Sequence, residues 1–349
     1  MTDERYRGRK ARVLDNGILE LVVMQEGGHI AAVTDKASKV NPLWAPPWPT
    51  IEPSEYSVSK HPEYGNDAES RLLSGILGHN LCMNIFGGPS AAEAAAGITV
   101  HGEASVANYE IEVNGDTLTQ HAVFPQARLR FSRTIRLPQQ SRSASITETV
   151  ENLAAEDTPL AWTQHVTLGP PFLEKGRTRF ESSATRSKVI EQDFTGGKGY
   201  MKIGAEFTWP MVPLAAGGTE DMRLFTNRPV SGAFSTHLMD PSHPKAWFTA
   251  WNPTHKLVFG YEWSPKDFPW LGIWEENFSR TQPPWNGKTL TRGLEFGVSP
   301  FPENRRAMIE RGQLFGVPSY RWLPAREKLS VSYRLFLLPA QSAPSGLPL

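Results

Sequence analysis

A strict alternation of apolar and polar residues in several short stretches is the feature that most restricts the fold of this chain. Between residues 124 and 137, leucine, phenylalanine and isoleucine alternate with arginine, and residues 145–151 alternate with the same period. A period of two places successive side chains on opposite faces of an extended strand. The only helix-like run is residues 90–97, and 29 glycines with 29 prolines imply many turns. These patterns predict an all-β chain with little helix.

Charge and cysteine content exclude several classes of function. Lys+Arg and Asp+Glu both total 36, so the zero net charge gives no electrostatic reason to expect nucleic acid or an anionic membrane as a partner. The single cysteine, Cys82, permits neither an internal disulfide nor a cysteine-based metal site. The charged N-terminus shows no secretory signal, and no run approaches the roughly 20 apolar residues of a membrane helix. We therefore expect a soluble cytoplasmic protein.

The chain shows no internal repeat and no linker long enough to separate two domains. We expect one domain over residues 8–339, followed by a flexible tail over residues 340–349 with several Ser, Pro and Gly residues. A proline-rich segment, Pro42–Pro53, predicts an extended loop. This loop is either a rigid connection or, through Trp44 or Trp48, a wall of a cleft.

Three polar residues in otherwise apolar surroundings are candidates for acid–base chemistry. His165 shares one face of a predicted strand with Thr163 and Thr167, which suggests a wet cleft. His101 precedes a glycine, and Glu295 lies between apolar residues flanked by glycines. A histidine can hold or release a proton near neutral pH, and a carboxylate is costly to bury without a partner. The alternative for a lone histidine is a satisfied structural residue.

An aromatic-rich stretch adds a candidate binding wall. In residues 268–278, a strand would place Trp274 and Glu276 on one face. Aromatic rings stack on the apolar faces of sugars, and carboxylates accept hydrogen bonds from sugar hydroxyls, so this face suits a carbohydrate cleft. A core tryptophan with exposed acids explains the same pattern.

Taken in order, these segments resemble the aldose 1-epimerase (galactose mutarotase-like) superfamily. The resemblance covers nearly the whole chain and implies a single large antiparallel β-sandwich. The matching segments are the opening strands Val13–Lys36, the Asn-containing run Asn41–Trp44, the His-Gly motif Val100–Gly102, the central His strand Thr163–Leu168, the Glu strand Leu294–Phe301 and the closing strand Ser330–Pro339.

The resemblance also implies a reaction, the interconversion of sugar anomers. It assigns the base to Glu295, the acid to His165, which would need to stay protonated, and binding or polarisation of the ring oxygen to His101. This chemistry requires no nucleotide and no metal as cofactor. The expected partner is a small-molecule carbohydrate, bound by a monomer or a homodimer.

The chain departs from the family pattern at two places. The usual Asn-Arg pair ahead of the His-Gly motif is absent, and we expect Arg71 and His79 to replace it, with Trp274 and Glu276 as a further wall. Val166-Thr167-Leu168 stands where an aromatic residue usually follows the central histidine. A non-catalytic sugar-binding protein of the same fold, or a different sugar-modifying enzyme, therefore remains an alternative.

A metal site built from histidines and a glutamate is a weaker alternative. The spacing His-Gly-Glu at residues 101–103 is not a standard ligand pattern, and neither H-x-H nor H-E-x-x-H occurs. The residues considered for it are His29, His79, His101 and Glu103.

Overall fold

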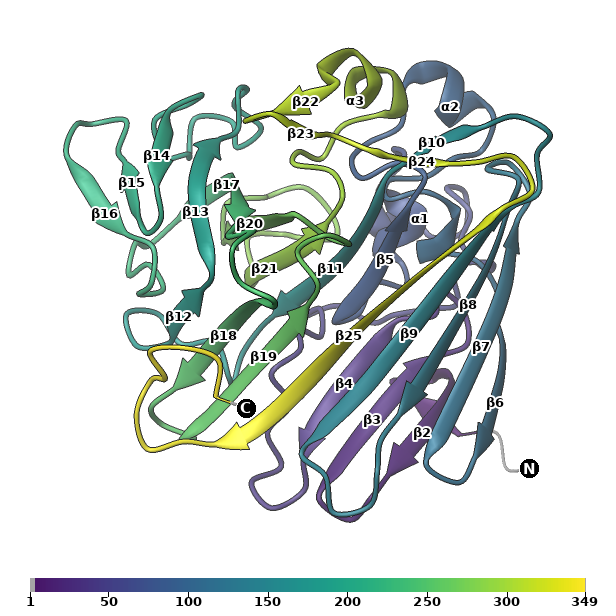
Figure 1. The fold of residues 1–349 in the computed structure, drawn as a ribbon, viewed down its shortest axis with the longest axis horizontal. Coiled ribbons are helices and arrows are strands. Elements are labelled where there is room, and N and C mark those ends of the chain that lie inside the picture. Colours follow the sequence, from purple (N-terminus) through teal and green to yellow (C-terminus); the bar gives the residue numbers. More distant parts are fainter. Residues whose placement is uncertain (1–3, 349) are drawn as a thin grey trace.

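Two large antiparallel sheets packed face to face form the body of the protein (Figure 1). The computed structural model describes residues 4–348. One sheet has eleven strands and the other has eight, and side chains from both contribute to one continuous core. The predicted all-β sandwich with little helix is therefore confirmed.

The larger sheet carries the strands that matter for the site. Its strands, in spatial order, are β1 (Arg5–Tyr6), β2 (Arg9–Asp15), β3 (Leu19–Met24), β4 (Ile30–Asp35), β5 (His79–Met83), β11 (Trp162–Leu168), β21 (Leu290–Gly297), β20 (Trp270–Asn277), β17 (Ser231–Met239), β13 (Ala184–Val189) and β14 (Glu206–Thr208).

The smaller sheet covers one face of the larger one. Its strands, in spatial order, are β12 (Arg179–Ser182), β18 (Ala246–Asn252), β19 (Leu257–Trp263), β25 (Lys328–Pro339), β9 (Ser143–Asn152), β8 (Leu129–Arg136), β7 (Thr117–Phe124) and β6 (Glu110–Asn114). Three two-stranded pairs complete the strands: β10 (Thr158–Leu160) with β24 (Arg321–Leu323), β15 (Met211–Pro213) with β16 (Thr219–Asp221), and β22 (Gln313–Leu314) with β23 (Val317–Pro318).

Helix is confined to short pieces in the connections. The predicted helical run at residues 90–97 contains α2 (Ala91–Ala95), whose N-terminus is closed by a capping box between Ser90 and Glu93. Four further short helices were not predicted, since such short helices leave little periodicity to detect: α1 (Ser70–Leu73), α3 (Arg305–Arg311), η1 (Pro62–Tyr64) and η2 (Glu103–Ser105). Among residues 4–348, no helix is long and apolar enough to cross a bilayer.

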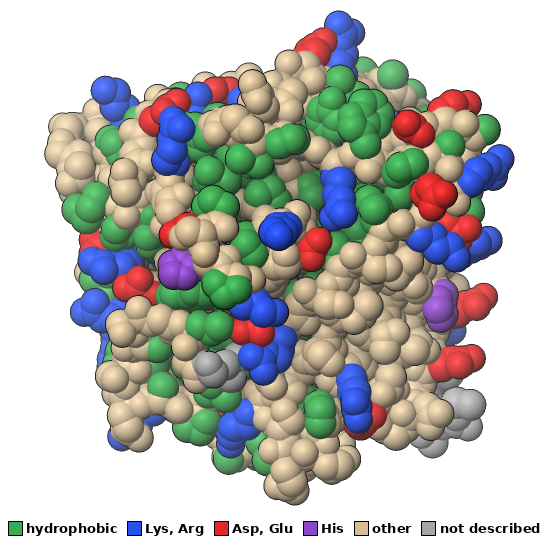
Figure 2. Space-filling model, in the orientation of Figure 1, with side chains coloured by type: hydrophobic (Ala, Val, Ile, Leu, Met, Phe, Trp, Pro, Cys, Tyr) green, Lys and Arg blue, Asp and Glu red, His purple; other side chains and the backbone are tan. Residues whose placement is uncertain are grey.

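The alternation in β8 matches the burial that the structure shows. Leu129, Phe131 and Ile135 are fully buried, while the Arg130 side chain is 54% exposed. On the face shown in Figure 2, basic and acidic side chains are interspersed, in keeping with their equal numbers. Arg133 is the exception in β8, because its side chain points into the core.

A cluster of buried polar side chains surrounds Arg133 between the two sheets. Its guanidinium donates to Glu148 at 2.6 Å. The same carboxylate accepts hydrogen bonds from Trp162, Gln164 and Tyr333. A buried ion pair is tolerated where hydrogen bonds satisfy the remaining polar atoms, and Glu148 meets that condition.

The proline-rich segment belongs to a long connection between β4 and β5, residues 36–78, which we call the excursion. The excursion covers the outer face of the larger sheet. Trp44 stacks on Trp285 with ring centroids 6.1 Å apart, and Trp48 meets Trp285 edge-on at 5.3 Å. All three tryptophans are buried, and they belong to an apolar cluster, separate from the main core, that joins the excursion to the turn carrying Trp285. The excursion is a packed structural element that lies against the outer face of the sheet.

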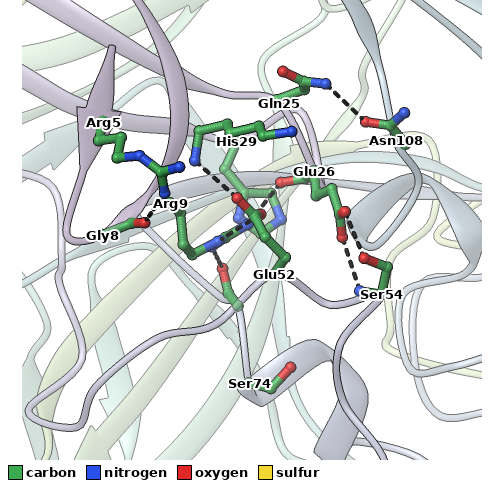
Figure 3. A network of polar contacts seen from close by, with 12 residues as sticks. Arg5, Gly8, Arg9, Gln25, Glu26, His29, Glu52, Ser54, Ser74 and Asn108 are labelled. Atoms are coloured by element: carbon green, nitrogen blue, oxygen red, sulfur yellow. Dashed lines mark hydrogen bonds and ion pairs between the residues drawn. The ribbon is translucent and has the colours of Figure 1, made fainter. Parts of the chain in front are cut away.

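Buried hydrogen bonds fasten this excursion to the first strands (Figure 3). Arg9 is only 1% exposed and donates to the Glu52 carboxylate at 3.1 Å and to the backbone carbonyls of Gly75 and Glu26. Nearby, His29 donates from Nε2 to the Ser105 carbonyl at 2.9 Å. These contacts fix both the excursion and the segment that follows His101.

Candidate functional site

The central feature of the site is a contact between His165 and Glu295. The two residues lie directly opposite each other on the neighbouring strands β11 and β21. His165 Nε2 lies 3.1 Å from Glu295 Oε1, and both side chains are almost completely buried. Because residues paired across antiparallel strands project to the same face, the register alone brings these distant positions together.

His101 approaches the same pair from a loop. Its ring centroid is 4.8 Å from that of His165. His101 Nδ1 lies 2.6 Å from the Phe86 carbonyl oxygen. Since a carbonyl can only accept, Nδ1 carries the hydrogen and the other ring nitrogen, Nε2, is an acceptor in the neutral ring. The structure thus brings together the three residues that the sequence singled out.

Backbone geometry explains the His-Gly motif. His101 has a φ of 67°, an uncommon left-handed conformation for a residue with a side chain. A Cβ added to Gly102, whose φ is 80°, would lie 2.2 Å from the Met83 carbonyl oxygen. The chain can therefore turn here, with His101 beside β11, only if residue 102 is a glycine.

A cavity of about 400 Å³ opens in front of the three side chains. Trp274 and Trp285 form apolar walls, and Glu69 and Arg280 contribute a charged wall. The volume and the mixture of aromatic walls with a few polar groups are typical of a small-molecule site. A neighbouring hollow of about 430 Å³ shares part of its wall with this cavity, but none of its described lining residues is a histidine.

Glu69 and Arg280 are site residues that sequence reasoning missed. An Arg280 guanidinium nitrogen lies 3.0 Å from Glu69 Oε1, and the guanidinium carbon lies 4.7 Å from the centroid of the Trp285 ring. Arg280 follows β20, and Glu69 directly precedes α1. Both stand in irregular segments where no alternation or motif marks a residue, so only the folded chain reveals the pair.

The predicted substrate-binding residues divide into two groups. Trp274 lines the cavity, as expected of a wall. Glu276 is buried beside it, and its carboxylate accepts hydrogen bonds from the backbone of Ser279 and Arg280, which holds the turn that carries Arg280. Glu276 therefore supports the wall from behind and is not among the residues that line this cavity.

Arg71 and His79 do not reach the cavity, contrary to expectation. Arg71 is exposed and its Nε donates to the Pro53 carbonyl. His79 projects into the core between the sheets, where its ring nitrogens lie 2.9 Å from Tyr261 Oη and from Gln164 Oε1. Both faces of β5 are buried, so polarity along this strand gives no indication of which side chains face outward.

Burial controls the protonation of the His165–Glu295 pair. Burial raises the pKa of Glu295 well above its usual range. Burial, followed by the proximity of His101, lowers the pKa of His165 well below its usual range. Both shifts favour the uncharged forms of the two groups, with the proton on Glu295. The environment of His165 therefore opposes the expectation that it stays protonated.

The four residues considered for a metal do not converge. His29 and His79 are engaged by Ser105 and by Gln164 and Tyr261, and Glu103 accepts from the backbone of residues 126 and 127. Within residues 4–348, no group of three or more His, Cys, Asp or Glu side chains is placed to hold a metal ion.

Comparison with known proteins gives a fold and leaves the activity open. Residues 86–206, about a third of the chain, match a family described as Domain of unknown function (DUF4432). No curated protein matches the chain.

Solved structures match over almost the whole length. A Klebsiella pneumoniae protein whose suggested assignment is aldose 1-epimerase has a TM-score of 0.68 at 13% identity, covering 97% of this chain and 82% of that one. A galactose mutarotase-like protein from Clostridium acetobutylicum has a TM-score of 0.61 at 16% identity, with 96% and 97% covered. A galactose mutarotase related enzyme from Lactobacillus acidophilus has a TM-score of 0.60 at 13% identity, with 96% and 99% covered.

At such low identity these likenesses establish architecture rather than chemistry. The β-sandwich and the near-complete coverage agree with the resemblance that the sequence showed. The chain has the galactose mutarotase-like fold.

Proposed function

We propose that the protein interconverts the anomers of an aldose, or of a close derivative, by acid–base catalysis at the His165–Glu295 pair. The observation that carries this proposal is the 3.1 Å contact between an imidazole and a carboxyl group that both line the cavity. Anomer interconversion needs one group to accept a proton and another to donate one, and the pair offers both.

The reaction begins with the movement of one proton within the His165–Glu295 pair. Transfer from Glu295 to His165 Nε2 gives a carboxylate beside an imidazolium. The carboxylate removes the proton from the anomeric hydroxyl O1, and the imidazolium protonates the ring oxygen O5 as the C1–O5 bond breaks. Rotation about C1–C2 and reclosure reverse both transfers and yield the other anomer. No proton is gained or lost overall.

The remaining walls suit a sugar. Trp274 and Trp285 offer aromatic surface to an apolar face of the ring. Glu69 can accept from sugar hydroxyls and Arg280 can donate to them, so this ion pair takes the place of the missing Asn-Arg grip. Nε2 of His101 can accept a hydrogen bond from a further sugar hydroxyl.

Polarimetry or NMR on freshly dissolved anomers tests the proposal. Glu295→Gln is nearly isosteric but cannot accept the O1 proton, so we expect kcat to fall by about 10²–10⁴-fold with little change in sugar affinity. His165→Asn should behave alike, whereas Arg280→Gln should mainly raise KM. The matched control is His121→Asn, on the exposed face of β7. Sugar binding without acceleration over buffer would instead support a binding protein of the same fold.

A further inference from the structure

Thr167 contacts the catalytic pair from its far side. Its hydroxyl oxygen lies 3.1 Å from His165 Nδ1, the ring nitrogen opposite the one that meets Glu295. The two residues are two positions apart on β11, so their side chains share a face. Thr167 is 1% exposed, which leaves water little access to this hydrogen bond.

The direction of this hydrogen bond follows from counting protons. When Glu295 is protonated, its hydroxyl donates to Nε2, and the hydrogen of the neutral imidazole must lie on Nδ1. When the proton moves to His165, the imidazolium carries hydrogen on both nitrogens. In both of these states, which are the two that the proposed reaction uses, Nδ1 is a donor and the Thr167 oxygen is the acceptor.

We propose that Thr167 is a positioning residue that accepts a hydrogen bond from Nδ1 of His165 and so reserves Nε2 for proton exchange with Glu295 and the sugar. This inference rests on the proposed function for its catalytic consequence, although the tautomer itself can be tested without it. A hydrogen bond at one imidazole nitrogen selects which nitrogen carries the proton.

His101 provides an internal comparison. Its Nδ1 donates to a backbone carbonyl, that of Phe86, which leaves Nε2 of His101 as the acceptor nitrogen, as proposed for His165. No side-chain substitution can remove the carbonyl that orients His101, whereas one substitution removes the hydroxyl that orients His165. The titratable groups around His165 are Glu295 and His101 on the cavity side and His79 and His29 farther away.

The experiment compares Thr167→Val with Thr167→Ser in protein labelled with ¹⁵N-histidine and free of ligand. The His165→Asn spectrum identifies the His165 signals by their absence. We expect His165 of the parent protein and of Thr167→Ser to be protonated at Nδ1 and unprotonated at Nε2 at neutral pH. In Thr167→Val the buried Nδ1–H would lack an acceptor, so the population should shift toward hydrogen on Nε2.

The result separates this proposal from the proposed function. Hydrogen on Nε2 in the parent protein, or an unchanged tautomer in Thr167→Val, would overturn the role of Thr167 even if sugars are turned over. If Thr167→Val does not fold, as judged by its melting curve, Thr167→Ala provides the same comparison.

The kinetic arm uses the same variants. In a protein that turns over sugar, Thr167→Val should lower kcat by at least about tenfold with KM nearly unchanged, and Thr167→Ser should restore most of the rate. Equal rates in the two variants would mean that the hydroxyl has no positioning role in turnover. A parent protein without turnover would refute the proposed function and leave the tautomer assignment standing.

Discussion

At the scale of single residues, the site depends on a missing side chain as much as on those present. A Cβ added to Gly293 would lie 2.5 Å from Glu295 Oε1 and 3.3 Å from the Trp274 side chain. Gly293 and Glu295 share a face of β21, so the glycine provides the space in which the carboxyl group turns toward His165. The space that the Glu295 carboxyl group needs therefore explains why position 293 is a glycine.

Gly293→Ala should lower activity by about 10²-fold because the carboxyl group must move away from its contact with His165, and displacements near 1 Å have effects of this size. The fold should be retained, since Gly293 is not in the left-handed region. Anomer interconversion measured by NMR, together with a melting curve, checks this. Gly346→Ala, whose Cβ would meet nothing within 4 Å, is the control. Full activity in Gly293→Ala would contradict this account of the glycine.

At the scale of elements, the excursion between β4 and β5 determines the shape of the cavity. It carries Glu69, and its tryptophans pack against Trp285. Trp48 also donates from Nε1 to the Leu73 carbonyl at 2.9 Å, which ties the start of the excursion to its end at α1. The wall of the cavity thus depends on packing outside the main core.

Trp48→Ala should destabilise the excursion by about 3–5 kcal/mol, the usual cost of removing a buried tryptophan. Hydrogen exchange read by mass spectrometry should quicken in peptides from residues 44–76, and KM for the sugar should rise. The strands of the smaller sheet should exchange as before, because they do not contact this cluster. Trp322→Ala is the control, since that side chain is 55% exposed. A uniform increase in exchange along the chain would refute a local role.

At the scale of the whole molecule, five histidines have pKa values below the usual range, with burial as the largest cause: His29, His79, His101, His165 and His237. Four of them are buried, and His101 is half-buried. Burial lowers the pKa of His29 and of His237 to about 3. In the unfolded chain these groups bind protons near pH 6.5. These histidines, which stay neutral in the folded protein, therefore stabilise it most strongly above about pH 6.5.

Acidification should consequently destabilise the protein. The unfolded state takes up protons below about pH 6.5 while the folded histidines stay neutral until about pH 3, so each of the two contributes a loss of about 2 kcal/mol between pH 7 and pH 5. The raised pKa of Glu295 acts in the opposite direction, because its protonated form favours folding at low pH.

Urea unfolding at pH 7, 6 and 5 isolates the histidine contribution by comparing variants. His237→Gln should show a shallower loss of stability with falling pH than the parent protein. His121→Gln, which replaces an exposed histidine, should show the same loss as the parent. An identical pH dependence in all three proteins would disprove the assignment to His237.

Much of the fold could be predicted from the sequence because its strands alternate regularly and its motifs keep the family order. The same motifs identified His101, His165 and Glu295, and adjacent strands place the last two opposite each other. The prediction for His79 was wrong because a strand buried on both faces gives no polarity signal. Arg280 could not be predicted, since its position depends on a loop and on contacts between distant segments.

The buried cluster around Glu148 is satisfied only when β11 is aligned in its native register. Glu148 accepts from Trp162 and Gln164, which project from β11 toward the core, while His165 projects the other way. A slip of β11 by one residue would turn every side chain of the strand to the opposite face. It would leave the Glu148 charge unmatched in the interior and remove His165 from the cavity. The same register therefore satisfies the buried hydrogen bonds of Glu148 and places His165 opposite Glu295. A chain that forms the first set of contacts has also assembled its candidate site.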